Sequence, residues 1–211
     1  MAAAVAPRPA VASHVDLAFN LGGPPTGAYR SEGDGLAMAD AYPLSTYRGG
    51  GLPSTPQGIV AASQRFSRDD HLVLHLPVAD GEYTLALLFA EVWAAACHRR
   101  GRVFDITVLG GAGAEVGAAD YDTYTAAGGR CHQPVIKTFS ALTAAGGSGL
   151  TVVLSRVVQN PTLAGVLVTG YSHPGGRPAR PWVPPTDGEL AAMRARRRAQ
   201  HRPTPPSAVF G

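Results

Sequence analysis

Alternation of apolar and polar residues predicts a series of short β-strands. Val15, Leu17 and Phe19 share one side of a run whose other side carries Asp16 and Ala18. Further apolar runs of strand length follow at residues 71–76, 82–92, 103–109, 133–139, 150–158 and 164–171. Gly, Pro or polar turn residues precede these runs, and no helical pattern lies between them. This order predicts an all-β fold, specifically an antiparallel β-sandwich of the jelly-roll type.

The runs at 71–76 and 82–92 are separated only by the turn sequence 77–81, so we expect them to pair as a hairpin. Three leucines occupy one face of the first run. His71 and His75 occupy the opposite face, which we expect to be solvated. The preceding region, residues 26–57, is rich in Gly, Pro, Ser and Tyr and has little periodicity, which is typical of loops that meet ligands.

The composition limits the chain to one domain with tails. Its 211 residues and 45% hydrophobic content suffice for one sizeable core. We expect a disordered leader at 1–13, a β-sandwich at 14–173 and a Pro/Arg-rich tail at 174–211. A short helix at 187–200 fits the tail, with Asp187 as its N-cap and arginines near its end. Since the helix shows no apolar stripe, we expect it to order only against a partner.

The net charge of +3 is unevenly distributed. Residues 1–176 carry 11 basic and 13 acidic side chains, whereas residues 177–211 carry 7 arginines and 2 acidic residues. Nucleic acid is therefore an unlikely partner for the body of the domain. The tail is expected to dock on an acidic surface. The residues expected to do this are Trp182, Arg194, Arg196, Arg197 and Arg198.

The first 13 residues lack the apolar run of a secretory signal, and no stretch reaches the length of a membrane span. The chain has two cysteines, Cys97 and Cys131, each followed by a histidine. We expect two unrelated thiols, with a disulfide or a Cys₂His₂ zinc site as alternatives. These features together predict a cytoplasmic location, or a lumenal or secreted one if the sequence is a fragment.

Three segments, taken in order, resemble the malectin and malectin-like domain family over about residues 15–171. The first is a strand that runs into Asn-Leu-Gly-Gly at 20–23. The second is LFAEVW at 88–93, followed by GRVFDI at 101–106, and the third is NPTLAGVLV at 160–168. The motif residues to which the resemblance gives a structural role are Asn20, Gly22, Gly23, Phe89, Glu91, Phe104, Asp105, Asn160 and Pro161.

The resemblance implies a non-catalytic β-sandwich that binds glucose-containing oligosaccharides or serves as an extracellular module of plant receptor kinases; some members are fused to kinesin-type motors. A sugar site of this kind needs several aromatic side chains at one rim. Trp93 keeps one aromatic position, but the other positions of the family's sugar platform carry different residues. They are Ala37 (or Met38, in a register shifted by one), Ala61, Ala94 and Gln159.

A rim facing a ligand or partner is therefore expected to use other side chains as well. The candidates are Trp93, Gln159, Tyr42, Tyr47, Tyr121 and Tyr124, with Tyr29 as a further aromatic in these loops. Glu91 and Asp105 invite an interpretation as the paired carboxylates of a glycosidase. We expect them instead to hydrogen-bond loop backbone, and we expect no enzyme activity, cofactor or metal.

Two functions follow from these observations. The first is a malectin-like module that acts as an intracellular structural or adaptor subunit through protein contacts, with a cytoskeletal assembly as one setting. Three features favour it: the missing secretory signal, the replacement of residues at the family's sugar-contacting positions, and the basic tail. The alternative is a carbohydrate-binding module for glucose-containing oligosaccharides or glycoproteins.

Overall fold

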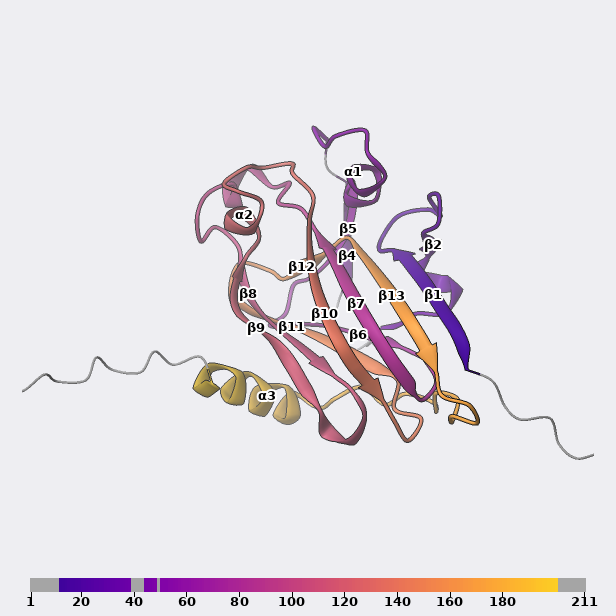
Figure 1. Cartoon of the computed structure of the whole chain (residues 1–211). Coiled ribbons are helices and arrows are strands. Elements are labelled where there is room, and N and C mark those ends of the chain that lie inside the picture. Colours follow the sequence, from indigo (N-terminus) through magenta and orange to yellow (C-terminus); the bar gives the residue numbers. More distant parts are fainter. Residues whose placement is uncertain (1–11, 39–43, 49, 201–211) are drawn as a thin grey trace, which may run out of the picture.

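Two antiparallel five-stranded sheets face each other across one core (Figure 1). The structure is a computed structural model that describes residues 12–38, 44–48 and 50–200, with backbone alone for residues 34, 44–48 and 112. This confirms the predicted all-β sandwich. Residues 1–11 and 201–211 of the expected disordered ends lie outside the described residues, whereas 174–200 are described and Ser13 already belongs to the first strand, β1.

The first sheet has the strand order β10-β7-β13-β1-β2 and the second has β3-β6-β11-β8-β9. The strands of the first sheet are β10 (Val135–Ala144), β7 (Gly81–Phe89), β13 (Gly165–Ser172), β1 (Ser13–Asn20) and the short parallel β2 (Arg30–Ser31). Those of the second are β3 (Ala37–Met38), β6 (His71–Leu76), β11 (Leu150–Val158), β8 (Val103–Leu109) and β9 (Glu115–Asp122).

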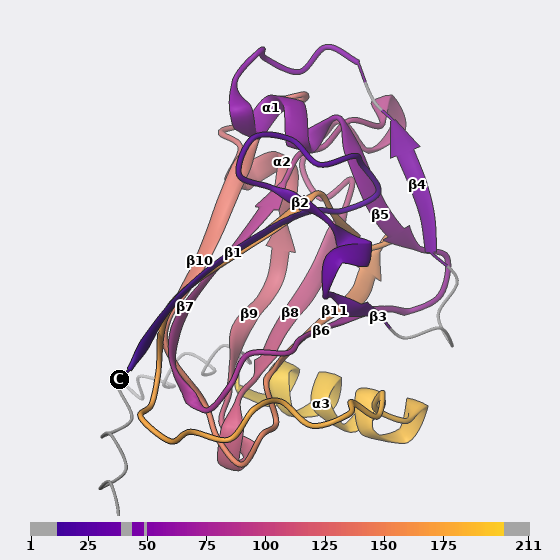
Figure 2. The ribbon, with the colours of Figure 1, turned by 90° about the vertical axis from the view of Figure 1, so that its right-hand side faces the viewer.

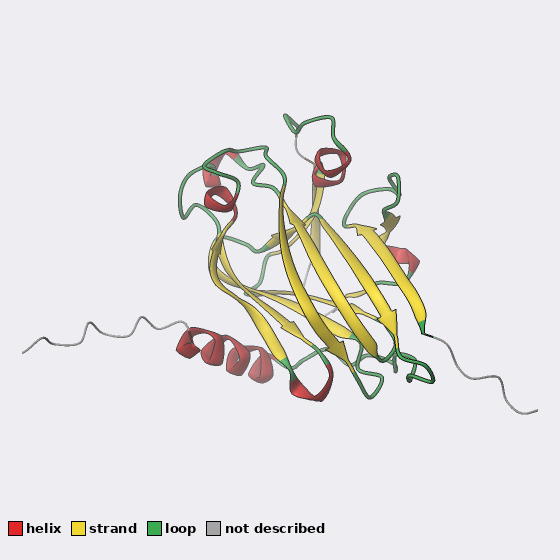
Figure 3. Ribbon diagram, viewed as in Figure 1, coloured by secondary structure: helices red, strands yellow, loops and turns green. Residues whose placement is uncertain are grey.

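A smaller third sheet, in the order β12-β5-β4, lies near the end of the sandwich that carries the first two helices. Its strands are β12 (Thr162–Leu163), β5 (Ser63–Ser67) and β4 (Leu44–Arg48). The helices are α1 (Pro56–Ala61), α2 (Thr123–Ala126) and α3 (Asp187–Gln200), and the 3₁₀ turns are η1 (Glu32–Asp34), η2 (Ala94–Ala96) and η3 (Gly111–Gly113). Figure 3 shows the helices at the margins of the strands.

The predicted hairpin of β6 and β7 is wrong, because the two strands belong to different sheets. β6 pairs with β11 and β3, whereas β7 pairs with β10 and β13. Each strand carries a fully apolar face, and these two faces pack against each other across the core. Leu74 and Leu85, for example, are both completely buried in this core. Because the apolar faces of β6 and β7 pack against each other, the two strands lie in opposite sheets and do not pair side by side.

Residues 174–200, which we call the C-terminal strap, fold back along the outer face of the second sheet. In Figure 2, α3 lies beside this sheet at the end opposite α1 and α2. Leu190 and Met193 pack on Val73 and Val153, next to Trp182. The helix therefore has a narrow apolar stripe, and the surface that orders it belongs to its own chain.

The start of α3 is capped by Thr186 instead of the expected Asp187. The Thr186 amide and hydroxyl both donate to Glu189 Oε2, at 2.7 and 2.8 Å. In return, the Glu189 amide donates to Thr186 Oγ1 at 3.3 Å. This reciprocal capping box satisfies N–H groups that the first turn of a helix leaves unpaired.

The expected docking of the tail on a separate acidic surface is replaced by docking on the domain itself. Arg196 and Arg197 each contact Glu115 at 3.2 Å, and Arg198 contacts Asp105 at 3.4 Å. Arg194 donates to the carbonyl oxygen of Arg156. The carboxylates of β9 and β8 thus provide the acidic surface on which the arginines dock.

The predicted solvation of His71 and His75 is wrong for the same reason. Their exposed fractions are 9% and 2%. The imidazole of His75 lies under the Trp182 indole, with ring centroids 5.3 Å apart and planes 7° from parallel. β6 is therefore covered on both faces, a result that its own alternation did not predict.

Leu190→Ala tests the docking of the strap. The substitution removes the fully buried side chain that joins α3 to Val73 and Val153. We expect it to weaken docking by about 3 kcal/mol. Amide hydrogen exchange should accelerate in α3 while β7 and β13 stay protected. The exposed Ala195→Ser is the control; equal exchange of α3 in both variants would contradict this packing.

Candidate ligand-binding site

A pocket of about 250 Å³ opens near one end of the sandwich, between the third sheet and the ends of β7, β8 and β11. Gln64 and Phe66 come from β5, and Val92 and Trp93 follow β7. Three more chain segments complete it. The full lining is Gln64, Phe66, Val92, Trp93, Arg102, Gln159, Asn160 and Thr162.

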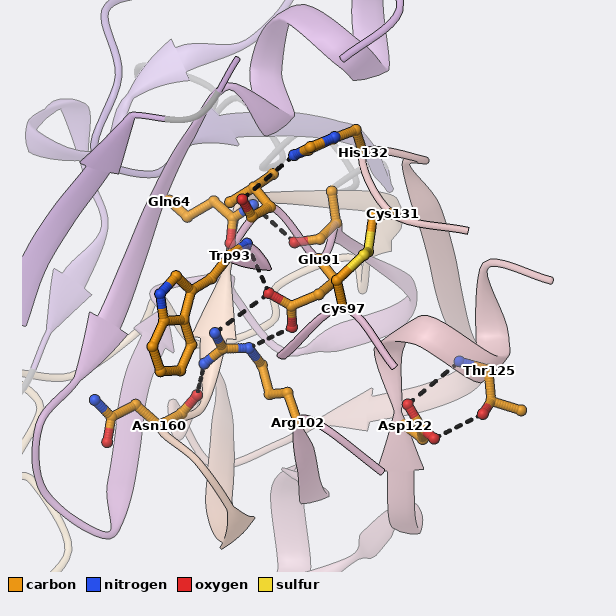
Figure 4. A network of polar contacts seen from close by, with 12 residues as sticks. Gln64, Glu91, Trp93, Cys97, Arg102, Asp122, Thr125, Cys131, His132 and Asn160 are labelled. Atoms are coloured by element: carbon orange, nitrogen blue, oxygen red, sulfur yellow. Dashed lines mark hydrogen bonds and ion pairs between the residues drawn. A yellow bond between two sulfur atoms is a disulfide. The ribbon is translucent and has the colours of Figure 1, made fainter. Parts of the chain in front are cut away.

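Trp93 presents an exposed aromatic face at this pocket. Its side chain is 41% exposed, although the preceding residues of the strand are buried. The Trp93 backbone N–H donates to Glu91 Oε1 at 3.0 Å, which fixes the chain where it leaves β7. The Arg102 guanidinium carbon lies 6.0 Å from the indole centroid (Figure 4). The indole thus contacts Arg102 and leaves part of its surface exposed to solvent.

Glu91 and Arg102 form a buried ion pair behind the indole. Arg102 Nε donates to Glu91 Oε2 at 2.7 Å, and the exposed fractions of the two side chains are 8% and 1%. Arg102 Nη1 also donates to the carbonyl oxygen of Asn160. The guanidinium therefore links the end of β7 to the loop before β12. Because the pair is internally neutral and the other lining side chains are uncharged, the described lining carries no net charge.

Amide and hydroxyl groups supply the polar part of the lining. Gln64 Nε2 donates to the carbonyl oxygens of Ala61 and Ala90, at 3.2 and 2.9 Å, which fixes its orientation. Thr162 Oγ1 is buried and has no hydrogen-bond partner within the described residues. A buried hydroxyl normally has a partner, so this one is an exception in the pocket wall.

A disulfide fixes the loop that follows Trp93. Cys97, directly after η2, is bonded to Cys131, and their Cα atoms are 5.7 Å apart. The expectation of two unrelated thiols is therefore wrong. Beside the bond, the His132 N–H donates to the Glu91 carbonyl oxygen at 2.8 Å. The loop after Trp93 and the segment between α2 and β10 thus form one unit (Figure 4).

Of the predicted rim residues, the structure brings Trp93 and Gln159 together at this pocket. Tyr121 instead packs in the core against Phe89 and Phe104, at centroid distances of 5.2 and 5.7 Å, and burial raises the pKa of its phenol. Tyr121 is on β9, whose inward positions were not recognised as a strand in the sequence.

The other tyrosines contribute no described side chain to the pocket. Tyr124 lies on α2, is partly exposed, and is not among the lining residues. Tyr42 lies outside the described residues, and only the backbone of Tyr47, in β4, is described. The sequence did not identify Gln64, Phe66, Arg102 and Thr162 as site residues. Arg102 could have been found, because it lies within the GRVFDI motif at 101–106 that follows Trp93.

The motif residues at the end of β1 support the neighbouring turn. Asn20 is buried, donates to the Pro24 carbonyl oxygen at 2.9 Å and accepts from Ser63 Oγ at 3.1 Å. Gly22 has a φ of 74°, and a Cβ on Gly23 would collide with the Ser63 hydroxyl and the Asn20 amide. These glycines therefore allow β1 to meet the third sheet.

The second and third motifs also provide structural contacts. Phe89 and Phe104 pack at 5.5 Å, and the Pro161 carbonyl oxygen accepts from the Ser67 amide at 3.3 Å. Asp105 is 2% exposed and accepts from the Asp120 amide at 2.9 Å. Asp105 and Glu91 are thus both occupied by donors, an arrangement unlike the two open carboxylates of a glycosidase.

A profile described as the malectin domain matches residues 18–166, about seven-tenths of the chain. This chain belongs to the malectin domain family. The resemblance inferred from the three motifs is confirmed. No curated protein matches the sequence significantly.

Three of the solved structures with the same fold are plant proteins. The plant receptor-like kinase FER has a TM-score of 0.57 at 15% identity, over 77% of this chain and 51% of that one. The ANXUR2 extracellular domain from Arabidopsis thaliana gives 0.55 at 15% identity, over 77% and 50%. FER in complex with the plant peptide RALF23 and LLG2 gives 0.54 at 16% identity, over 75% and 40%. The malectin chain thus spans about half the length of these proteins, or less.

The predicted cytoplasmic, cytoskeletal location is wrong. The ANXUR2 structure, which shares this fold, is an extracellular domain. The disulfide between Cys97 and Cys131 agrees with an oxidising compartment. Within the part of the chain that the structure describes, no helix is long and apolar enough to cross a membrane.

Glu91→Gln tests the buried ion pair. It leaves the Arg102 charge buried without its carboxylate, which should lower the free energy of unfolding by about 3–5 kcal/mol. Urea denaturation measures this loss. The double variant Glu91→Leu/Arg102→Met removes both charges and should recover part of the stability. A Glu91→Gln protein as stable as the wild type would show that the pair has no structural role.

Cys97→Ala/Cys131→Ala tests the disulfide. The bond closes a loop with a sequence separation of 34 residues. Its removal should cost about 3–4 kcal/mol through the entropy of the unfolded chain. Thermal unfolding with and without a reducing agent measures the change. Alkylation of the unreduced, denatured wild type should find no thiol; two labelled cysteines would refute the bond.

Proposed function

We propose that this malectin domain is a non-catalytic carbohydrate-binding module that takes an uncharged, glucose-containing oligosaccharide in the pocket at Trp93, in an extracellular or lumenal compartment. The observation that carries the proposal is an exposed indole at the wall of a pocket with no net charge. A pyranose offers an apolar face to an aromatic ring and hydroxyls to polar groups around it. The described lining matches both requirements.

The polar groups of the pocket suit hydroxyls better than ions. Gln159 and Asn160 carry amides, which both donate and accept hydrogen bonds. Among the described lining side chains, the one charge belongs to Arg102, and Glu91 neutralises it. A charged ligand would find no counter-ion here, whereas a neutral sugar requires none.

The pocket volume of about 250 Å³ is less than the roughly 300 Å³ at which pockets for drug-sized ligands begin. The pocket therefore accommodates one sugar unit closely, and the rest of an oligosaccharide extends into solvent. Ala61 and Ala94 offer no additional rings at the positions where the family pattern has aromatic residues. We accordingly infer weak binding, with a Kd on the order of 0.1–1 mM.

A peptide or protein ligand is the second candidate. FER, which shares the fold, was solved in complex with the peptide RALF23 and the protein LLG2. The exposed Trp93 indole offers such a ligand an apolar contact at the rim of the pocket. A peptide that binds at Trp93 and is not displaced by oligosaccharides would favour this candidate.

Trp93→Ala tests the carbohydrate proposal. Loss of the stacking surface should weaken binding of glucose di- and oligosaccharides at least tenfold, as measured by calorimetry with the full chain. Tyr171→Ala is the matched control, because Tyr171 is an aromatic residue with 59% exposure on β13 and is not a lining residue of the pocket. If the wild type binds none of the saccharides at millimolar concentration, the proposal is wrong.

A further inference from the structure

The C-terminal strap covers two buried histidines, and this arrangement is independent of the ligand pocket. His71 and His75 lie on the outer face of β6, which the strap closes. His75 is 2% exposed, and its ring stacks against Trp182. The only two imidazoles on this strand are therefore both beneath the strap.

The surroundings of His75 suit a neutral ring and not a cation. Its Nδ1 is 3.1 Å from Thr151 Oγ1. Its Nε2 is buried and has no hydrogen-bond partner in the described structure, and Gly149 approaches the ring so closely that a Cβ there would collide with it. A doubly protonated ring would bury an N–H without an acceptor. The Trp182 indole attracts a cation but cannot accept that hydrogen bond in the ring plane.

The charged groups near the two rings differ. His71 has Asp70 and Arg156 on the body of the domain and Asp187 and Arg194 on α3, so attraction and repulsion oppose each other. Its Nδ1 is 3.0 Å from Ser155 Oγ. Around His75, β11 offers the uncharged Thr151, β3 offers Ala37, and the strap offers Trp182.

Little apolar surface holds α3 in place. Leu190 and Met193 are its buried apolar side chains, and its polar contacts with the body include the arginine contacts at its C-terminal half and Asp187 near His71. An element with few apolar contacts opens at a lower free energy than the core. The strap can therefore separate from the sheet while the sandwich stays folded.

We propose that acid releases the strap: protonation of His75, assisted by that of His71, separates Trp182 and α3 from the second sheet and exposes the apolar patch around Val73 and Val153. At neutral pH the uncharged rings allow the strap to close. In an acidified compartment, the charged rings need water, which enters only when the strap leaves.

The direction of the pH dependence follows from proton linkage. Burial lowers the pKa of His75, and burial is also the largest influence lowering the pKa of His71. With the strap released, both rings return towards their ordinary pKa of about 6.5. The released state therefore binds more protons below that pH, and docking weakens by at most roughly tenfold per histidine for each pH unit. Above pH 7 both rings are neutral in both states, and docking is at full strength.

Trp182 provides the measurement, because the chain contains only two tryptophans. In a full-length Trp93→Phe protein, the fluorescence and acrylamide quenching of Trp182 are followed from pH 7.5 to 4.5. We expect quenching to rise between pH 6.5 and 5. The far-UV circular dichroism of the strands should not change over this range. No change in quenching, or a change that coincides with loss of the strands, would overturn the proposal.

Variants assign the transition to the histidines. His75→Phe keeps a ring beneath Trp182 without a proton to bind, and it should shift release at least one pH unit lower. The exposed His98→Gln is the matched control and should behave as the wild type. Should His75→Phe fail to fold, Glu115→Gln, which removes a carboxylate paired with Arg196 and Arg197, should move release to higher pH. If the pH of strap release is unchanged in the folded His75→Phe or Glu115→Gln protein, the proposal is wrong.

Discussion

The buried ion pair of Glu91 and Arg102 is the contact on which the site depends. Glu91 accepts from the Trp93 amide and from Arg102, and Arg102 in turn reaches the Asn160 carbonyl. Three segments that are distant in sequence are thereby fixed relative to one another. Two charges removed from water are tolerated only when they satisfy each other, so the pair also fixes the electrostatics of the pocket. Without it, neither the position of the indole nor the neutrality of the lining would be defined.

The two large sheets differ in what covers their outer faces. The second sheet is closed by the C-terminal strap, through Trp182, Leu190 and Met193. Part of the first sheet is covered by α1, where Val60 and Ala61 pack on Leu88. The family profile matches residues 18–166, and the strap follows this span. The candidate ligand pocket and the docked strap thus occupy separate surfaces of one sandwich.

Much of the fold could be predicted because local patterns determine strands. The alternation at 103–109 and 150–158 located β8 and β11, and the three motifs located the family. Contacts between segments that are distant in the sequence could not be predicted in this way. The separation of β6 and β7 into two sheets depends on which apolar faces meet, and the burial of His75 depends on a segment about 100 residues later in the chain.

Only part of the candidate site could be predicted, again because contacts between distant loops leave no local pattern in the sequence. Trp93 and Gln159 follow from the family pattern, but the contact between Arg102 and Asn160 joins loops 58 residues apart. Tyr121 was misplaced because an aromatic residue in an irregular stretch can point inwards or outwards, and only packing decides.

The indole N–H signals of Trp93 and Trp182 offer the most direct test of the central claim, in a nuclear magnetic resonance titration with a glucose oligosaccharide. Binding at the pocket predicts a shift of the Trp93 signal while the Trp182 signal stays in place; an unmoved Trp93 signal at saturating sugar would contradict it.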